Sequence, residues 1–84
     1  MKIYTLLVET KNEIDEQEEF DMTETVLESD RDHVWSIRVI ETFTRSKRFK
    51  VEIETDDEFI FEPFEMNMYN EGYEIEVLEV MAEV

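Results

Sequence analysis

Two stretches of this sequence alternate between apolar and charged residues, and this alternation constrains the fold more than any other feature. The first stretch is residues 49–54 and the second is residues 73–77. Successive side chains of a β-strand point to opposite faces, so each stretch predicts a half-buried strand with one apolar and one charged face. After residue 77 the alternation changes phase at Leu78 and Val80, which predicts a β-bulge.

The first residues of the chain indicate a third strand. Residues 3–10 are apolar on both faces, which is typical of a strand in the interior of a sheet. The acidic residues 12–19 predict a solvated loop. Residues 21–28 alternate weakly through Met22, Val26 and Leu27, so we expect them to return as a second strand.

The segment between residues 55 and 73 is expected to be β-structure and connections. Asp56, Asp57 and Glu58 predict a turn, followed by a strand whose Phe59 and Phe61 face inward. Pro63 ends that strand or places it at the edge of a sheet. Residues 66–72 predict a connection.

Residues 29–44 admit two interpretations. Ser29 with Asp32 resembles a capping box, and Trp35, Ile37 and Phe43 share one broad face at helical spacing. The same segment is rich in β-branched residues and also alternates as a strand would. We predict a helix here and keep the strand as the alternative.

Together these elements predict a single α+β domain over residues 1–84. Its antiparallel sheet has four or five strands, and one helix packs on one face. A small all-β domain without the helix is the alternative. Because the chain is 42% hydrophobic and contains six Phe and three Tyr, we expect it to fold despite its charge.

The charge is large and unevenly distributed. The chain has 24 Asp and Glu against 8 Lys and Arg, a net charge of −16. Residues 12–30 hold nine acids and residues 51–84 hold twelve, and neither range contains Lys or Arg. This charge opposes direct binding to nucleic acid or to an anionic membrane and favours basic partner proteins. With no cysteine, no signal peptide and no apolar membrane span, we expect a cytoplasmic protein.

We expect no enzyme, no cofactor and no metal site. His33 is the only histidine, no serine is placed for a nucleophile–base pair, and Gly72 is the only glycine, so a phosphate-binding Gly-rich loop is excluded. The acidic clusters at residues 15–21 and 56–58 lack the alternating pattern of an EF-hand loop. The basic residues 45–50 are expected to complement a helix C-terminus and to pair with carboxylates rather than to contact nucleic acid.

The carboxylates themselves suggest a function. Glutamates on the charged faces of two neighbouring strands would form a regular array of negative charge comparable to that of DNA. In size and charge segregation the chain is similar to small acidic DNA mimics, many of them made by phages against host nucleic-acid enzymes. We therefore hypothesise a non-catalytic, phage-encoded inhibitor that mimics nucleic acid towards a basic, nucleic-acid-binding protein. The predicted partner-binding residues are Glu52, Glu54, Asp56, Asp57, Glu58, Glu74 and Glu76.

Three alternatives remain open from the sequence. The acidic residues 13–21 are a second candidate for the binding surface. A small structural or assembly protein could associate through an exposed strand over residues 73–80, giving a homodimer. Adaptation to high salt would also produce an acidic surface.

Overall fold

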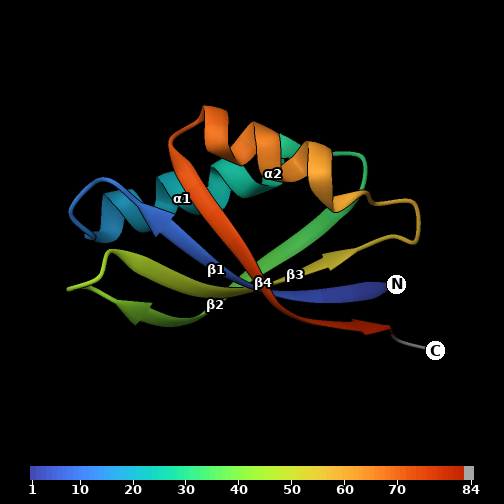
Figure 1. Cartoon of the computed structure of the whole chain (residues 1–84), viewed down its shortest axis with the longest axis horizontal. Helices are drawn as coiled ribbons and strands as arrows, with labels where there is room; N and C mark the ends of the chain where they lie inside the picture. The colour runs from blue at the N-terminus through green and yellow to red at the C-terminus, as the bar shows by residue number, and fades with distance from the viewer. Residues whose placement is uncertain (83–84) are drawn as a thin grey trace.

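A computed structural model of the protein describes residues 1–82, which form one four-stranded antiparallel sheet with two helices on one face (Figure 1). The order along the chain is β1, α1, β2, β3, α2, β4. The elements are β1 (Lys2–Thr10), α1 (Glu16–Ser29), β2 (Val34–Phe43), β3 (Arg48–Thr55), α2 (Phe61–Asn70) and β4 (Tyr73–Ala82).

The strands lie in the order β2-β3-β1-β4, which with this chain order is the ferredoxin-like, or split βαβ, arrangement. The α+β class and the antiparallel sheet are therefore confirmed, with two helices where one was predicted. Three strand predictions are also confirmed: β1 is interior, β3 is half-buried, and β4 has a register shift opposite Thr5 and Leu6 that leaves Leu78 as the bulge residue.

Helix α1 occupies the segment that was predicted to be loop and strand, so that prediction is wrong. The Asp15 side chain caps the helix by accepting a 2.8 Å hydrogen bond from the backbone N–H of Glu18. Glutamates in the first turn favour the positive end of the helix dipole. Met22 and Val26, one turn apart, are fully buried against the sheet.

Strand β2 occupies the segment that was predicted to be a helix, so this prediction is also wrong. The register against β3 shifts twice, between Val34 and Ser36 and between Val39 and Glu41. Trp35 and Ile40 are therefore the extra residues of two bulges, and both are exposed. The two bulges break the period of two that would otherwise have marked a strand.

Helix α2 replaces the predicted inward-facing strand and connection. Pro63 lies in the first turn of the helix, where its missing N–H costs nothing. Phe64 and Met68 are buried one turn apart. The helix ends at Asn70, and Gly72 follows its C-cap residue with a φ of 95°, in the left-handed region that glycine tolerates.

The core lies between the helices and one face of the sheet. Its largest fully buried side chains come from both layers: Phe49, Phe64, Leu6, Met22, Ile53 and Met68. Phe59, although not on a strand, is buried and packs edge-on against Tyr4, with 5.1 Å between the ring centroids. The opposite face of the sheet has no covering layer within the described residues.

Candidate interaction surface

The fold separates the charge of the chain into two layers. The helices with their flanking turns, residues 11–33 and 56–72, contain sixteen Asp and Glu and two Lys or Arg, which are Lys11 and Arg31. The strands and the β2–β3 hairpin, within residues 1–82, contain seven acids and six Lys and Arg. Nearly all of the net charge therefore belongs to the helical layer, while the sheet layer is close to neutral.

The solvent-facing side of α1 carries the densest row of these acids. Five of its carboxylates are exposed along the helix: Glu16, Glu19, Asp21, Glu24 and Glu28. With a rise of about 1.5 Å per residue they average about 4.5 Å of helix axis per charge. One strand of duplex DNA has a charge about every 3.4 Å. At about 3.6 residues per turn these carboxylates spread over about half of the helix circumference. The match to a phosphate backbone is therefore one of average charge spacing along the axis.

The four predicted sheet glutamates share one face but do not form a continuous array. Glu52 and Glu54 belong to β3 and Glu74 and Glu76 to β4, and β1 lies between these two strands. The expectation that the two strands are side by side is wrong. Strands that are second neighbours are about 9.6 Å apart.

Basic residues on the same face of the sheet also dilute its charge. Arg38 forms an ion pair with Glu52, and Arg48 Nε lies 3.0 Å from Glu9 Oε1. Lys50 lies between Leu7 and Glu41 in the register. The uncovered face of the sheet is therefore a surface of mixed charge and a weaker match to nucleic acid than the helical layer.

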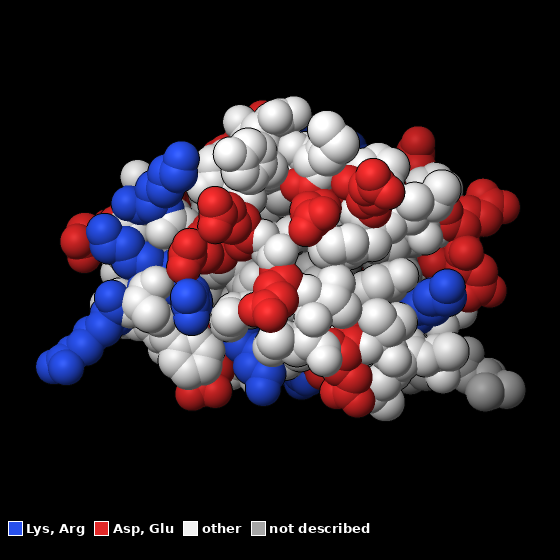
Figure 2. Space-filling view, viewed as in Figure 1, with Lys and Arg blue, Asp and Glu red and all other residues white. Residues whose placement is uncertain are grey.

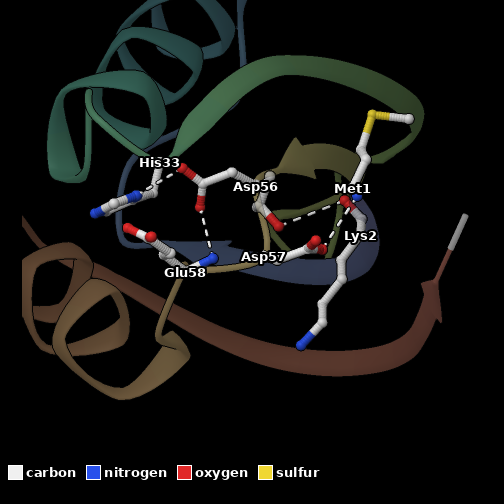
Figure 3. A network of polar contacts seen from close by, with 7 residues as sticks. Met1, Lys2, His33, Asp56, Asp57 and Glu58 are labelled. Carbon is white, nitrogen blue, oxygen red and sulfur yellow. Dashed lines mark hydrogen bonds and ion pairs between the residues drawn. The ribbon is translucent and has the colours of Figure 1, made fainter.

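The predicted acidic turn is confirmed as a turn, but two of its three carboxylates are engaged within the molecule (Figure 3). Asp56 Oδ2 lies 2.7 Å from Nδ1 of His33, and Asp57 Oδ1 lies 3.1 Å from the amino group of Met1. Asp56 also accepts a 3.0 Å hydrogen bond from the backbone N–H of Glu58. The turn thus fastens the start of β1 and the start of β2 to the end of β3.

His33 and Asp56 shift each other's protonation equilibria. Their hydrogen bond raises the pKa of His33 above its ordinary value of 6.5, and the carboxylates of Asp56, Asp30 and Asp32 add to this effect. The same hydrogen bond lowers the pKa of Asp56 below 3.8. His33 was expected on the surface of a helix, but it lies in the turn between α1 and β2 with a partner of its own.

One acid of the helical layer, Glu18, is buried, and its hydrogen bonds connect three elements of the fold. Glu18 is 5% exposed and accepts hydrogen bonds from Thr10 Oγ1 at 3.2 Å, Asn12 Nδ2 at 2.8 Å and the Tyr73 hydroxyl at 3.1 Å. Burial and the Glu18 charge raise the pKa of Tyr73 far above its ordinary value. The network ties the first turn of α1 to the end of β1 and the start of β4.

The basic stretch of the sequence lies in the hairpin between β2 and β3 and continues into β3. Its expected place at a helix C-terminus is wrong, whereas its pairing with carboxylates is confirmed for Lys47 with Glu13 at 3.8 Å and for Arg48 with Glu9. Figure 2 shows Lys and Arg gathered at the end of the molecule where Figure 1 places the tip of this hairpin. Over α2 and the adjoining part of β4, the charged atoms in the same view are mainly those of Asp and Glu.

A groove between α2 and β4 is the feature that the sequence analysis missed. It has a volume of about 380 Å³ and is lined by Met66, Tyr69, Tyr73 and Ile75, with Glu65 and Glu74 among its polar residues. No residue of β1 or α1 lines it, so it opens on the side of β4 away from β1. Because residues 66–72 were predicted to be a connection, nothing indicated a helix beside this strand.

Neither a metal centre nor a membrane helix is found in residues 1–82. No three His, Asp or Glu side chains of this range converge as a metal site would require. Across the same residues, no helix combines the length and apolar content needed to cross a bilayer.

No protein-family model matches the sequence, and a comparison with curated proteins finds no significant relative. The ferredoxin-like arrangement hosts many unrelated functions, so it identifies none by itself. The charge and shape of the surfaces described above are therefore what indicates a function.

Proposed function

We propose that this protein is a non-catalytic binding protein whose acidic helical layer occupies the nucleic-acid-binding site of a basic partner protein. The observation that carries the proposal is the separation of charge between the two layers. Sixteen acids on one rigid layer, with two basic residues among them, give that side a strongly negative potential. Such a field attracts a basic surface over long distances and speeds its association.

The proposed mechanism is competition. A site that binds nucleic acid gains free energy when Lys and Arg are neutralised by phosphates and counterions are released. The exposed carboxylates of α1 present a similar row of charges on a surface that is already folded, so little additional ordering accompanies binding. The partner would then be unable to hold nucleic acid at the same time. Such a partner would place the protein in the cytoplasm.

We therefore assign the proposed binding residues to the helices rather than to the sheet. Glu52 is paired with Arg38, and Asp56 and Asp57 are paired with His33 and the N-terminus. Their charges are partly compensated inside the molecule. The surface of α1 has one ion pair to a basic residue, that between Glu28 and Arg31, so most of its charge is available to a partner.

Capture and displacement test this function. The immobilised protein is exposed to a bacterial lysate, and bound proteins are eluted either with duplex DNA or with a salt gradient and then identified. We expect a small set of nucleic-acid-binding proteins that DNA displaces and that elute at high salt. Capture of many basic proteins at low salt, with no displacement by DNA, would mean that the charge acts non-specifically.

Self-association through a strand edge is the second candidate, and one observation favours it. Within the described residues, β4 pairs only with β1 and is an edge strand, with Leu78, Val80 and Met81 exposed along it. The net charge of −16 on each copy opposes this dimer. Sedimentation velocity at physiological salt measures whether the protein is a monomer or a dimer. A monomer at high protein concentration would remove this candidate.

A further inference from the structure

The free edge of β4 lies beside an apolar groove, and the two features together define a site for an extended chain. Strand β4 is ten residues long, and its outer backbone N–H and C=O groups have no strand partner within residues 1–82. An edge of this kind can hydrogen-bond an added strand. Alongside it on α2, Met66 is 61% exposed and Tyr69 is 65% exposed.

The two faces of β4 differ in chemistry. Tyr73, Ile75 and Val77 point to the helical side, where the groove opens. Glu74 and Glu76 point to the uncovered side of the sheet, and Glu79 joins them after the bulge. A strand added to this edge would therefore have one row of side chains against the groove and the other row beside the glutamates.

We propose that the β4 edge and the groove next to α2 bind an extended segment of another protein in which apolar residues alternate with Lys or Arg. The backbone of the segment continues the sheet beyond β4. Its apolar side chains enter the groove and contact Met66, Tyr69 and Ile75. Its basic side chains pair across the strands with Glu74 and Glu76.

Charge selects this occupant over a second copy of the chain. Two β4 strands paired antiparallel about a twofold axis would bring the two rows of glutamates onto the same face, side by side. Like charges opposite each other across strands are destabilising, and each copy also carries a net charge of −16. A segment that carries Lys or Arg is instead attracted to the glutamates of β4. This inference does not depend on the carboxylates of α1 acting as a nucleic-acid mimic, because it concerns the groove between α2 and β4.

A synthetic peptide tests the site on the intact protein. The probe is a blocked eight-residue peptide of alternating lysine and valine, followed by NMR chemical shifts and amide hydrogen exchange. We expect slower exchange of the outward amides of β4 and shifts at Met66 and Tyr69. One control peptide has the same residues in two blocks, four lysines and then four valines. A second has every backbone nitrogen methylated. Both should bind at least tenfold more weakly.

Matched variants separate this site from general attraction. The double variant Glu74→Gln/Glu76→Gln should weaken peptide binding about two- to tenfold. The control Glu19→Gln/Glu24→Gln changes the net charge equally on α1 and should change binding less than twofold. Equal binding of the methylated or block peptide, or an equal loss in both double variants, would overturn the proposal. A dimer whose β4 amides are protected without peptide would assign the edge to a second copy instead.

Discussion

His33 and Asp56 join two turns that are far apart in sequence but adjacent in the fold. Their side chains meet at 2.7 Å, and the backbone N–H of Asp56 donates a 3.0 Å hydrogen bond to the carbonyl of His33 (Figure 3). The pair closes the end of the sheet where β2 begins and β3 ends. It also engages within the molecule an aspartate that was predicted to bind a partner, and leaves that side chain 25% exposed.

This pair should make the stability of the protein depend on pH. The raised pKa of His33 means that its contribution is complete below pH 6.5 and is lost as the pH rises through the folded-state value. The lowered pKa of Asp56 means that its contribution is present above pH 3.8 and is lost as the pH falls through its folded-state value. The pair therefore stabilises most between these two limits.

Comparison of the wild type with His33→Gln by urea unfolding isolates the effect from the general repulsion of the carboxylates. We expect a difference in unfolding free energy at pH 5.5 that decreases towards zero at pH 9. A difference of the same size at both values would show that charge on His33 does not contribute.

The buried Glu18 network should be important for stability. Glu18→Ala leaves the hydroxyls of Thr10 and Tyr73 without their acceptor inside the protein. We expect a loss of about 2–4 kcal/mol in unfolding free energy, because hydrogen bonds to a buried charged group are lost together. Glu24→Ala, at an exposed position on the same helix, should cost less than about 0.5 kcal/mol. Similar losses in both variants would contradict the structural role of Glu18.

The start of α1 gives a test of the helix itself. Asp15→Ala removes the side-chain cap and should destabilise the protein by about 1 kcal/mol. Asp32→Ala removes the same charge from the turn before β2, where a helix start was expected from the sequence, and should cost less than about 0.5 kcal/mol. Thermal unfolding followed by circular dichroism measures both. A larger loss at Asp32 would favour the helix predicted over residues 29–44.

The strands with a regular alternation could be predicted from the sequence, and the helices could not. Strands β3 and β4, with the bulge at Leu78, follow from apolar side chains at a period of two, and β1 follows from a run that is apolar on both faces. Helix α1 has few apolar residues, so the spacing of Met22 and Val26 also fits a strand. The clearest sequence indication of its start is the pair Asp15 and Glu18, which has the spacing of a capping box. The similar pair Ser29 and Asp32 has the same spacing, and a helix was predicted to start there instead.

Strand β2 and helix α2 were not predicted because their sequences do not follow the regular pattern of a strand or a helix. The bulges at Trp35 and Ile40 shift the phase of β2 and create a helical spacing on a strand. The alternation of Phe59 with Phe61 indicates a strand, although Phe61 begins a helix. The acids of α1 were assigned to a loop, so their arrangement along a helix was not part of the predicted binding surface. The groove beside β4 depends on α2 and was therefore not predictable.

The dependence of folding on salt separates surface repulsion from adaptation to high salt. Screening of a net charge of −16 should raise the unfolding temperature as NaCl increases from 10 to 500 mM. We expect native circular dichroism already at the lowest concentration, because the core contains large, fully buried side chains from both layers. Unfolding below molar salt would favour adaptation to high salt instead.

The central claim is that the helical layer is the surface that binds a nucleic-acid-binding partner, and the kinetics of a captured partner test it most directly. The triple variant Glu16→Gln/Glu19→Gln/Glu24→Gln is compared with Glu41→Gln/Glu54→Gln/Glu79→Gln, which makes the same charge change on the sheet layer. The account predicts slower association, a shallower salt dependence and about tenfold weaker binding for the helix variant, at about 0.5 kcal/mol per charge. The sheet variant should remain within about threefold of the wild type, close to one such charge in total. Equal losses in the two variants, or a larger loss in the sheet variant, would contradict the account.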